Sequence, residues 1–66
     1  MRNIAYLRRA AGLSQEELGN AVGVSQMAVS FWENGKSYPS AAILPKIADV
    51  LGCTIDELYA SCDLKV

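Results

Sequence analysis

The chain has 66 residues and a formal net charge of −1, and it contains two cysteines but no histidine. This length allows one small domain over residues 1–66. Histidine, the commonest general base, is absent, and no paired acids or activated nucleophile are evident. We therefore expect no enzymatic activity, metal or cofactor. No apolar run is long enough to cross a membrane and no secretory signal precedes RNIAYLRRA, so we expect a cytoplasmic protein.

The first two predicted elements are short helices separated by a turn. Residues 3–11 are expected to form a helix that ends at Gly12, because glycine readily adopts the left-handed conformation that follows many helices. Ser14 stands three residues before Glu17, which is the spacing of a capping box and predicts a helix over residues 15–22. Gly23 stops that helix, and Val24 can turn inward. The capping and terminating residues thus predict two helices, with a tight turn after the second that leads directly into a third element.

The third predicted helix covers residues 26–34, with Ser25 as its cap and Gly35 at its end. At about 100° per residue, one narrow arc of this helix is expected to face the core, and it carries Ser25, Ala28, Val29 and Trp32. The opposite, outward side carries Met27, Ser30, Phe31 and Asn34. Large apolar groups set among polar ones on an outward face are typical of a contact surface.

The remaining chain predicts two more helices and no strand. After the loop KSYPS, Pro45 removes a backbone donor, so residues 40–44 are expected to form a loose or 3₁₀-like turn before a regular helix over residues 44–51. Gly52 ends this helix. Thr54 and Glu57 have the spacing of a second capping box, which begins a last helix over residues 55–61. The fold class is therefore predicted to be all-α.

One ion pair is predicted between distant helices. The core-facing arc of the first helix carries Ile4, Leu7 and Ala11, with Arg8 at its edge. A charge at the edge of a core is costly unless it is paired. Glu33 lies on the matching flank of the third helix, so we expect Arg8 and Glu33 to form a salt bridge.

Four segments together resemble one family nearly end to end, from about Ile4 to Tyr59: LRRAAGLSQEELG, GVSQ, WENGKSYPS and LPKIADVLGCTIDELY. The chain is similar to the phage-repressor/Cro-like (Xre) family of helix-turn-helix domains. The resemblance implies a compact five-helix bundle of the lambda-repressor-like DNA-binding type. It also implies sequence-specific binding to double-stranded DNA and regulation of transcription, with repression as the expected effect. Gly19 departs from the family pattern, in which this position is more often alanine.

The resemblance also assigns roles to individual positions. The base-reading positions of the recognition helix correspond to Gln26, Met27, Ser30 and Phe31. The phosphate-contacting positions correspond to Ser14, Gln15, Asn34 and Lys36, and the cations Arg2 and Arg9 are further candidates, with ordinary solvated charges as the alternative. Arg8 and Glu33 match the interhelix pair of the family.

Two alternatives stay open at the level of function and assembly. The same fold can act as a protein-interaction module, antitoxin-like or regulatory, whose Met27/Phe31 face contacts a protein. For DNA binding we expect a weak homodimer on a palindromic operator with half-sites about one helical turn apart. The resemblance implies that such domains pair through the last helix and the loop before it, so the expected dimer interface comprises Ile55, Leu58, Tyr59 and Leu64. Cys53 and Cys62 are expected to be free thiols, with a redox switch as the less favoured interpretation.

Overall fold

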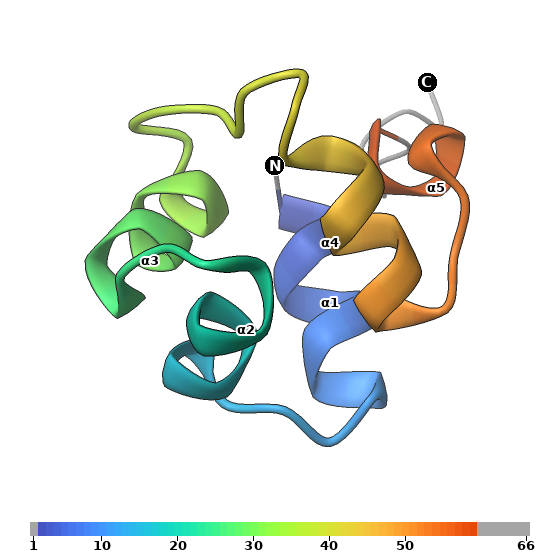
Figure 1. Cartoon of the computed structure of the whole chain (residues 1–66), viewed down its shortest axis with the longest axis horizontal. Coiled ribbons are helices and arrows are strands. Elements are labelled where there is room, and N and C mark those ends of the chain that lie inside the picture. The colour runs from blue at the N-terminus through green and yellow to red at the C-terminus, as the bar shows by residue number, and fades with distance from the viewer. Residues whose placement is uncertain (1, 60–66) are drawn as a thin grey trace.

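The computed structural model describes the backbone of residues 2–59, with side chains from Asn3 onward. Within these residues the chain forms five α-helices and no strand, which confirms the predicted all-α fold (Figure 1). The helices are α1 (Arg2–Ala10), α2 (Gln15–Val22), α3 (Gln26–Asn34), α4 (Leu44–Leu51) and α5 (Ile55–Tyr59).

The predicted bounds of α2, α3 and α4 are confirmed, whereas α1 begins and ends one residue earlier than expected. Ala11 therefore lies in the turn after α1 and is exposed, and its predicted place in the core-facing arc is wrong. The structure describes α5 to Tyr59, and the predicted last two residues of this helix lie outside the described part. Before α4, the amide of Ile43 donates to the carbonyl oxygen of Ser40 at 3.0 Å, which is the expected 3₁₀-like turn ahead of Pro45.

The turn between α2 and α3 depends on two glycines. Gly23 has φ +84°, in the left-handed region that residues with a Cβ atom rarely adopt. Gly19 lies within α2, and a Cβ atom added there would lie 2.7 Å from the carbonyl oxygen of Val24. The absence of a side chain at Gly19 therefore lets the backbone after α2 pass directly over this helix, and Ser25, the cap of α3, lies against the middle of α2.

Every helix contributes to one core. The largest fully buried side chains are Ile4, Leu18, Val29, Ile47 and Leu58. Ordinary helix amphipathicity explains this arrangement, since each helix turns its apolar stripe toward the others. In addition, the side-chain amide of Asn3 donates to the backbone carbonyl of Glu57 and joins α1 to α5.

Helices α3 and α5 lie at opposite ends of the longest axis, with α1 and α4 between them (Figure 1). Helix α2 packs mainly on α3 and α4. Among the described residues, no helix is long and apolar enough to cross a membrane, and no group of three or more acidic or thiol side chains is arranged to hold a metal ion. The packing thus leaves the outward side of α3 uncovered at one end of the molecule.

Candidate nucleic-acid interface

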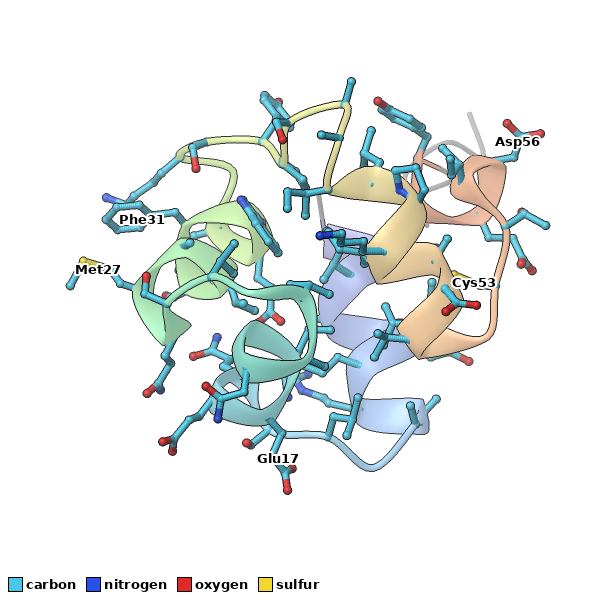
Figure 2. All side chains as sticks on the ribbon, in the orientation of Figure 1. Glu17, Met27, Phe31, Cys53 and Asp56 are labelled. Atoms are coloured by element: carbon cyan, nitrogen blue, oxygen red, sulfur yellow. The ribbon has the colours of Figure 1, made fainter. Side chains whose placement is uncertain are left out.

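Helix α3 is fixed to the core by one side and presents the other to solvent. Its cap forms as predicted, because the Ser25 hydroxyl accepts the Ala28 amide at 3.1 Å. Val29 is fully buried. In contrast, Met27 is 63% exposed and Phe31 is 40% exposed, and both point away from the body of the molecule (Figure 2). The predicted division of α3 is therefore confirmed for its large side chains, with Val29 and Trp32 buried and Met27 and Phe31 exposed. It is wrong for Ser25, which is exposed rather than turned to the core, and Ser30 on the outward side is only half-exposed.

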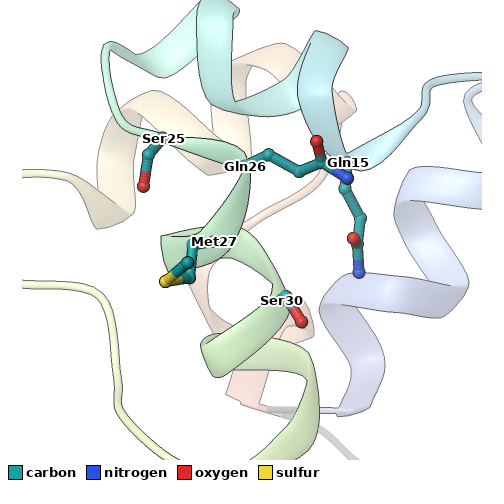
Figure 3. Close-up of a pocket in the computed structure, with 5 residues that line it drawn as sticks. All are labelled: Gln15, Ser25, Gln26, Met27 and Ser30. Carbon is teal, nitrogen blue, oxygen red and sulfur yellow. The ribbon is translucent and has the colours of Figure 1, made fainter.

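A shallow groove lies where the beginnings of α2 and α3 meet. It has a volume of about 490 Å³ and is lined by Gln15, Ser25, Gln26, Met27 and Ser30. Figure 3 shows the Gln26 side chain extending from the first turn of α3 toward Gln15 on α2. The structure thus brings the predicted base-reading residues Gln26, Met27 and Ser30 beside the predicted phosphate-contacting residue Gln15.

The predicted salt bridge between Arg8 and Glu33 is confirmed. The Nε atom of Arg8 lies 2.6 Å from Oε2 of Glu33, and the two side chains are only 9% and 7% exposed. A second bond joins Nη2 of Arg8 to Oε1 of Glu33 at 3.2 Å, and Nη1 of Arg8 donates to the Leu13 carbonyl at 2.8 Å. The guanidinium group therefore ties α1 to both α3 and the α1–α2 turn.

A third member of this cluster was missed in the sequence. Nε2 of Gln15 donates to Oε1 of Glu33 at 2.9 Å, so the first residue of α2 joins the ion pair. Burial by itself raises the pKa of Glu33. Hydrogen bonds from Arg8 and Gln15, with the positive charges of Arg8 and Arg9, outweigh burial, and the pKa lies below its ordinary value. Glu33 is thus held as a carboxylate that orients both Arg8 and Gln15.

The beginning of α2 has a defined set of open backbone donors. The first amides of a helix have no partner within the helix. Here the capping box uses two of them: the amide of Ser14 donates to Glu17 Oε1 at 2.8 Å, and the amide of Glu17 donates to Ser14 Oγ at 3.0 Å. The amides of Gln15 and Glu16 remain, pointing along the helix axis where an anion is favoured. Because Ser14 Oγ accepts from the Glu17 amide, the hydroxyl proton of Ser14 is still able to donate a hydrogen bond.

Predicted cationic and polar contacts surround this end of the molecule. Arg9 and Lys36 are exposed. Arg9 lies near enough to Glu33 to lower its pKa, which places its charge on the side of the Arg8–Glu33 cluster. The Asn34 side chain is also exposed and donates to Ser30 Oγ at 3.3 Å. The side chain of Arg2 lies outside the described residues.

The predicted dimer surface needs one correction. Leu58 is 0% exposed, because α5 turns this residue into the core, so it is not available for contact with a second chain. Ile55 and Tyr59 are exposed on the same helix, at 37% and 60%. Leu64 lies outside the described residues. Two of the four predicted residues thus stay candidates in the part of the chain that is described.

The two cysteines have different outcomes. Cys53 is half-buried and packs against the core, as expected. Burial, followed by the charge of Glu57, raises the pKa of the Cys53 thiol, so it is protonated and poorly reactive at neutral pH. Cys62 lies outside the described residues. Burial of Cys53 therefore makes a redox switch at this position less favoured.

Comparison with known proteins decides the family. The helix-turn-helix family model matches residues 4–58 of the chain. The chain belongs to the helix-turn-helix family. Its fold is that of a phage repressor: the solution structure of the DNA-binding domain of the P22 C2 repressor (residues 1–76) has a TM-score of 0.81 and 33% identity, over 86% of this chain and 75% of that one. The predicted resemblance and the five-helix fold are thereby confirmed.

Relatives in this helix-turn-helix family include regulators of different sizes. The chain is 41% identical to the HTH-type transcriptional activator BcrR of Enterococcus faecalis, over 92% of this chain but 30% of the activator. It is 40% identical to the HTH-type transcriptional regulator YazB of Bacillus subtilis, over 86% of this chain and 83% of YazB. The chain thus spans less than a third of BcrR and most of YazB.

Proposed function

We propose that the chain is a transcriptional regulator that binds duplex DNA in a sequence-specific manner, with α3 in the major groove. The observation that carries this proposal is the outward side of α3, whose polar and apolar side chains face solvent while Val29 and Trp32 pack in the core. Helix-turn-helix domains insert the second helix of the motif into the major groove with its N-terminal residues against the base edges. Gln26, Met27, Ser30 and Phe31 would then read bases.

Backbone amides and flanking cations supply the phosphate contacts in this proposal. The open amides of Gln15 and Glu16 at the start of α2 suit a phosphate oxygen without any lysine. Gln15 Nε2 carries a second proton beyond the one that it donates to Glu33, and this proton is available to the same phosphate. Lys36 and Arg9 are exposed and would add contacts at the flanks. The slight negative net charge of the chain therefore does not prevent binding, although it limits the affinity of one copy.

A homodimer on a palindromic operator follows from this limited affinity. Two copies on half-sites about one helical turn apart would double the phosphate contacts. Ile55 and Tyr59 are the exposed apolar residues of α5 that we assign to a weak twofold contact. Sedimentation of the full chain with operator DNA should show two protomers per duplex. Tyr59→Ser should weaken this assembly, whereas Tyr6→Ser on α1 should leave it unchanged. A single protomer on the duplex at saturation would rule out the dimer.

Repression is the effect that we propose for this regulator, acting on DNA in the cytoplasm. It is supported by the likeness to the DNA-binding domain of the P22 C2 repressor, at 33% identity and a TM-score of 0.81. The activator BcrR is more than three times as long as the part of it that this chain matches. Expression of a reporter placed behind the operator should fall when the chain is present. A rise in expression would instead identify an activator.

A protein-interaction module is the second candidate, and the exposure of Met27 and Phe31 favours it. The two candidates differ in their response to salt. Binding to DNA releases counterions and weakens steeply as salt increases, whereas an apolar contact with a protein does not.

Selection from random duplexes at low salt tests the proposed function. We expect an enriched motif with twofold symmetry, and a binding constant for it that falls steeply with salt. Replacement of Gln26 by Ala should change the preferred sequence with little effect on folding, since the side chain is exposed. Tyr6→Ala is the matched exposed variant on α1, and it should select the same motif as the unmodified chain. Failure to enrich any motif would exclude sequence-specific DNA binding.

A further inference from the structure

The outward side of α3 is unusual in what it offers to a base pair. Its first two turns present Gln26, Met27, Ser30 and Phe31, with no lysine or arginine among them. Guanine is read in the major groove by bidentate arginine or lysine at its O6 and N7 acceptors. No arginine or lysine lies on α3, so guanine lacks its usual bidentate partner on this helix.

Met27 and Phe31 form an apolar pair on one side of the helix. They stand four residues apart, which places their Cβ atoms about 5–6 Å from each other on the same face. Both side chains point outward from α3 (Figure 2), and 63% of Met27 and 40% of Phe31 are exposed to solvent. The apolar group that base pairs display in the major groove is the C5-methyl group of thymine. Base pairs are stacked about 3.4 Å apart, so the pair spans one to two base-pair steps.

Polar residues beside this pair favour the same base pairs. Gln26 lines the same groove as Met27, and its side chain extends toward Gln15 (Figure 3). A glutamine amide can bond adenine at N6 and N7 together. Ser30 Oγ accepts a bond from Asn34, which leaves its own proton to donate to an acceptor such as thymine O4. Adenine on one strand and a thymine methyl on the other belong to the same A·T pair.

A protein partner fits this surface less well than DNA does. Stable protein interfaces bury about 800 Å² on each partner, far more than two side chains supply. The apolar pair is also continuous with the polar groove lined by Gln15 and Gln26, at the end of the molecule where the open amides of α2 can meet phosphate. A surface that mixes two apolar side chains, amide groups and helix amides suits a nucleic-acid groove.

We propose that Met27 and Phe31 read the C5-methyl groups of two nearby pyrimidines, so that the operator half-site contains thymines at these positions within an A·T-rich core. This inference rests on the proposed function, since it names the bases that α3 recognises. The contact is a hydrophobic one between methyl, thioether and phenyl groups. It assigns specificity to two residues that cannot form a bidentate hydrogen bond with any base.

Removal of single methyl groups from the DNA tests the proposal. Deoxyuridine differs from thymidine by the absence of the C5-methyl group, so base pairing is kept while the contact is removed. Each thymine of the selected operator is replaced in turn, and binding is measured by fluorescence anisotropy at fixed salt. Removal of one contacted methyl should weaken binding about fourfold, which corresponds to about 0.8 kcal/mol, and removal of both about fifteenfold. An operator in which 5-methylcytosine·G replaces a contacted T·A pair should bind about fourfold more tightly than an operator with cytosine·G at the same place.

Protein variants connect the effect to the two side chains. The double variant Met27→Ala, Phe31→Ala should bind thymine and deoxyuridine operators equally. Tyr6→Ala removes an aromatic side chain that is 67% exposed on α1, and this control should keep the full sensitivity to deoxyuridine. If a motif is selected but deoxyuridine leaves its affinity unchanged, or if the double variant keeps the sensitivity, the methyl contact is wrong while DNA binding stands. If no motif is selected, the proposed function fails and the inference fails with it.

Discussion

Replacement of Glu33 by Gln should destabilise the fold strongly at neutral pH. The substitution keeps the size of the side chain but removes the negative charge beside Arg8, whose side chain is only 9% exposed. A buried cation without its counterion is costly, and removing one partner of a buried pair typically costs about 3–5 kcal/mol. The glutamine oxygen can still accept up to two of the three hydrogen bonds that Glu33 accepts, because Arg8 Nη2 and Gln15 Nε2 both donate to Oε1. We therefore expect a loss of about 3 kcal/mol, at the lower end of this range.

This loss is large for a domain of this size. A chain of this length has a free energy of unfolding of roughly 3–10 kcal/mol. The melting temperature should fall by roughly 12–24 °C, since each kcal/mol shifts it by about 4–8 °C in small domains. Urea denaturation followed by circular dichroism at pH 7 measures the free energy of unfolding directly.

The pH dependence gives an independent check of the cause. The pKa of Glu33 in the folded chain lies below its ordinary value of 4.5, so the unfolded chain binds the proton more readily. The stability that the carboxylate contributes is therefore complete above about pH 4.5 and is lost as the pH falls through the lower pKa of the folded chain. The difference in stability between the unmodified chain and Glu33→Gln should accordingly be largest near pH 7 and should close in acid.

A double substitution keeps the experiment informative even if Glu33→Gln does not fold. Replacing Arg8 and Glu33 together by Met removes both charges and leaves apolar side chains of similar volume, which is often neutral or stabilising. We expect the double variant to regain most of the stability that Arg8→Met alone loses. A loss below 1 kcal/mol for Glu33→Gln, or a difference that stays constant from pH 7 into acid, would refute this explanation of the pair.

Three further predictions concern the turn, a cap and the DNA contacts. Gly19→Val should destabilise the chain by about 3 kcal/mol in urea denaturation, because its side chain would meet the backbone carbonyl of Val24; unchanged stability would show that the α2–α3 crossing is looser than described. Ser14→Ala should cost about 1 kcal/mol by removing the acceptor of the Glu17 amide, while Ser37→Ala in the exposed loop serves as its control. Lys36→Ala should weaken binding equally for all operator sequences and reduce the slope of log K against log salt by about 1; an unchanged slope would remove Lys36 from the phosphate contacts.

The elements and several pairings of this chain were predictable because their causes are local. A capping box at Ser14, a serine cap at residue 25 and glycines after the helices act within a few residues, and each fixes a boundary. The Arg8–Glu33 pair could be predicted as well, since a charge at the edge of a core requires a partner and helical geometry offered one.

Other features depend on distances between helices, which a single sequence does not reveal. Gln15 joins Glu33 because the close crossing at Gly19 brings the start of α2 beside α3, and nothing in the residue type of Gln15 signals this. The place of Leu58 on the last helix predicts a dimer contact, but this residue lies fully in the core. In a helix as short as α5, rotation by one residue decides which apolar side chain faces inward.

The most direct test of DNA binding through α3 is the change in backbone amide resonances of the labelled chain when the selected duplex is added. We expect the largest changes at the start of α2, along Gln26–Phe31 on α3 and at Lys36, with a weaker set at Ile55 and Tyr59 if two copies meet on the duplex. A duplex of unrelated sequence at the same salt should give smaller changes at the phosphate-facing amides and little at Gln26–Phe31. Changes confined to α4 and α5, with α3 unaffected by the selected duplex, would show that this helix does not read DNA.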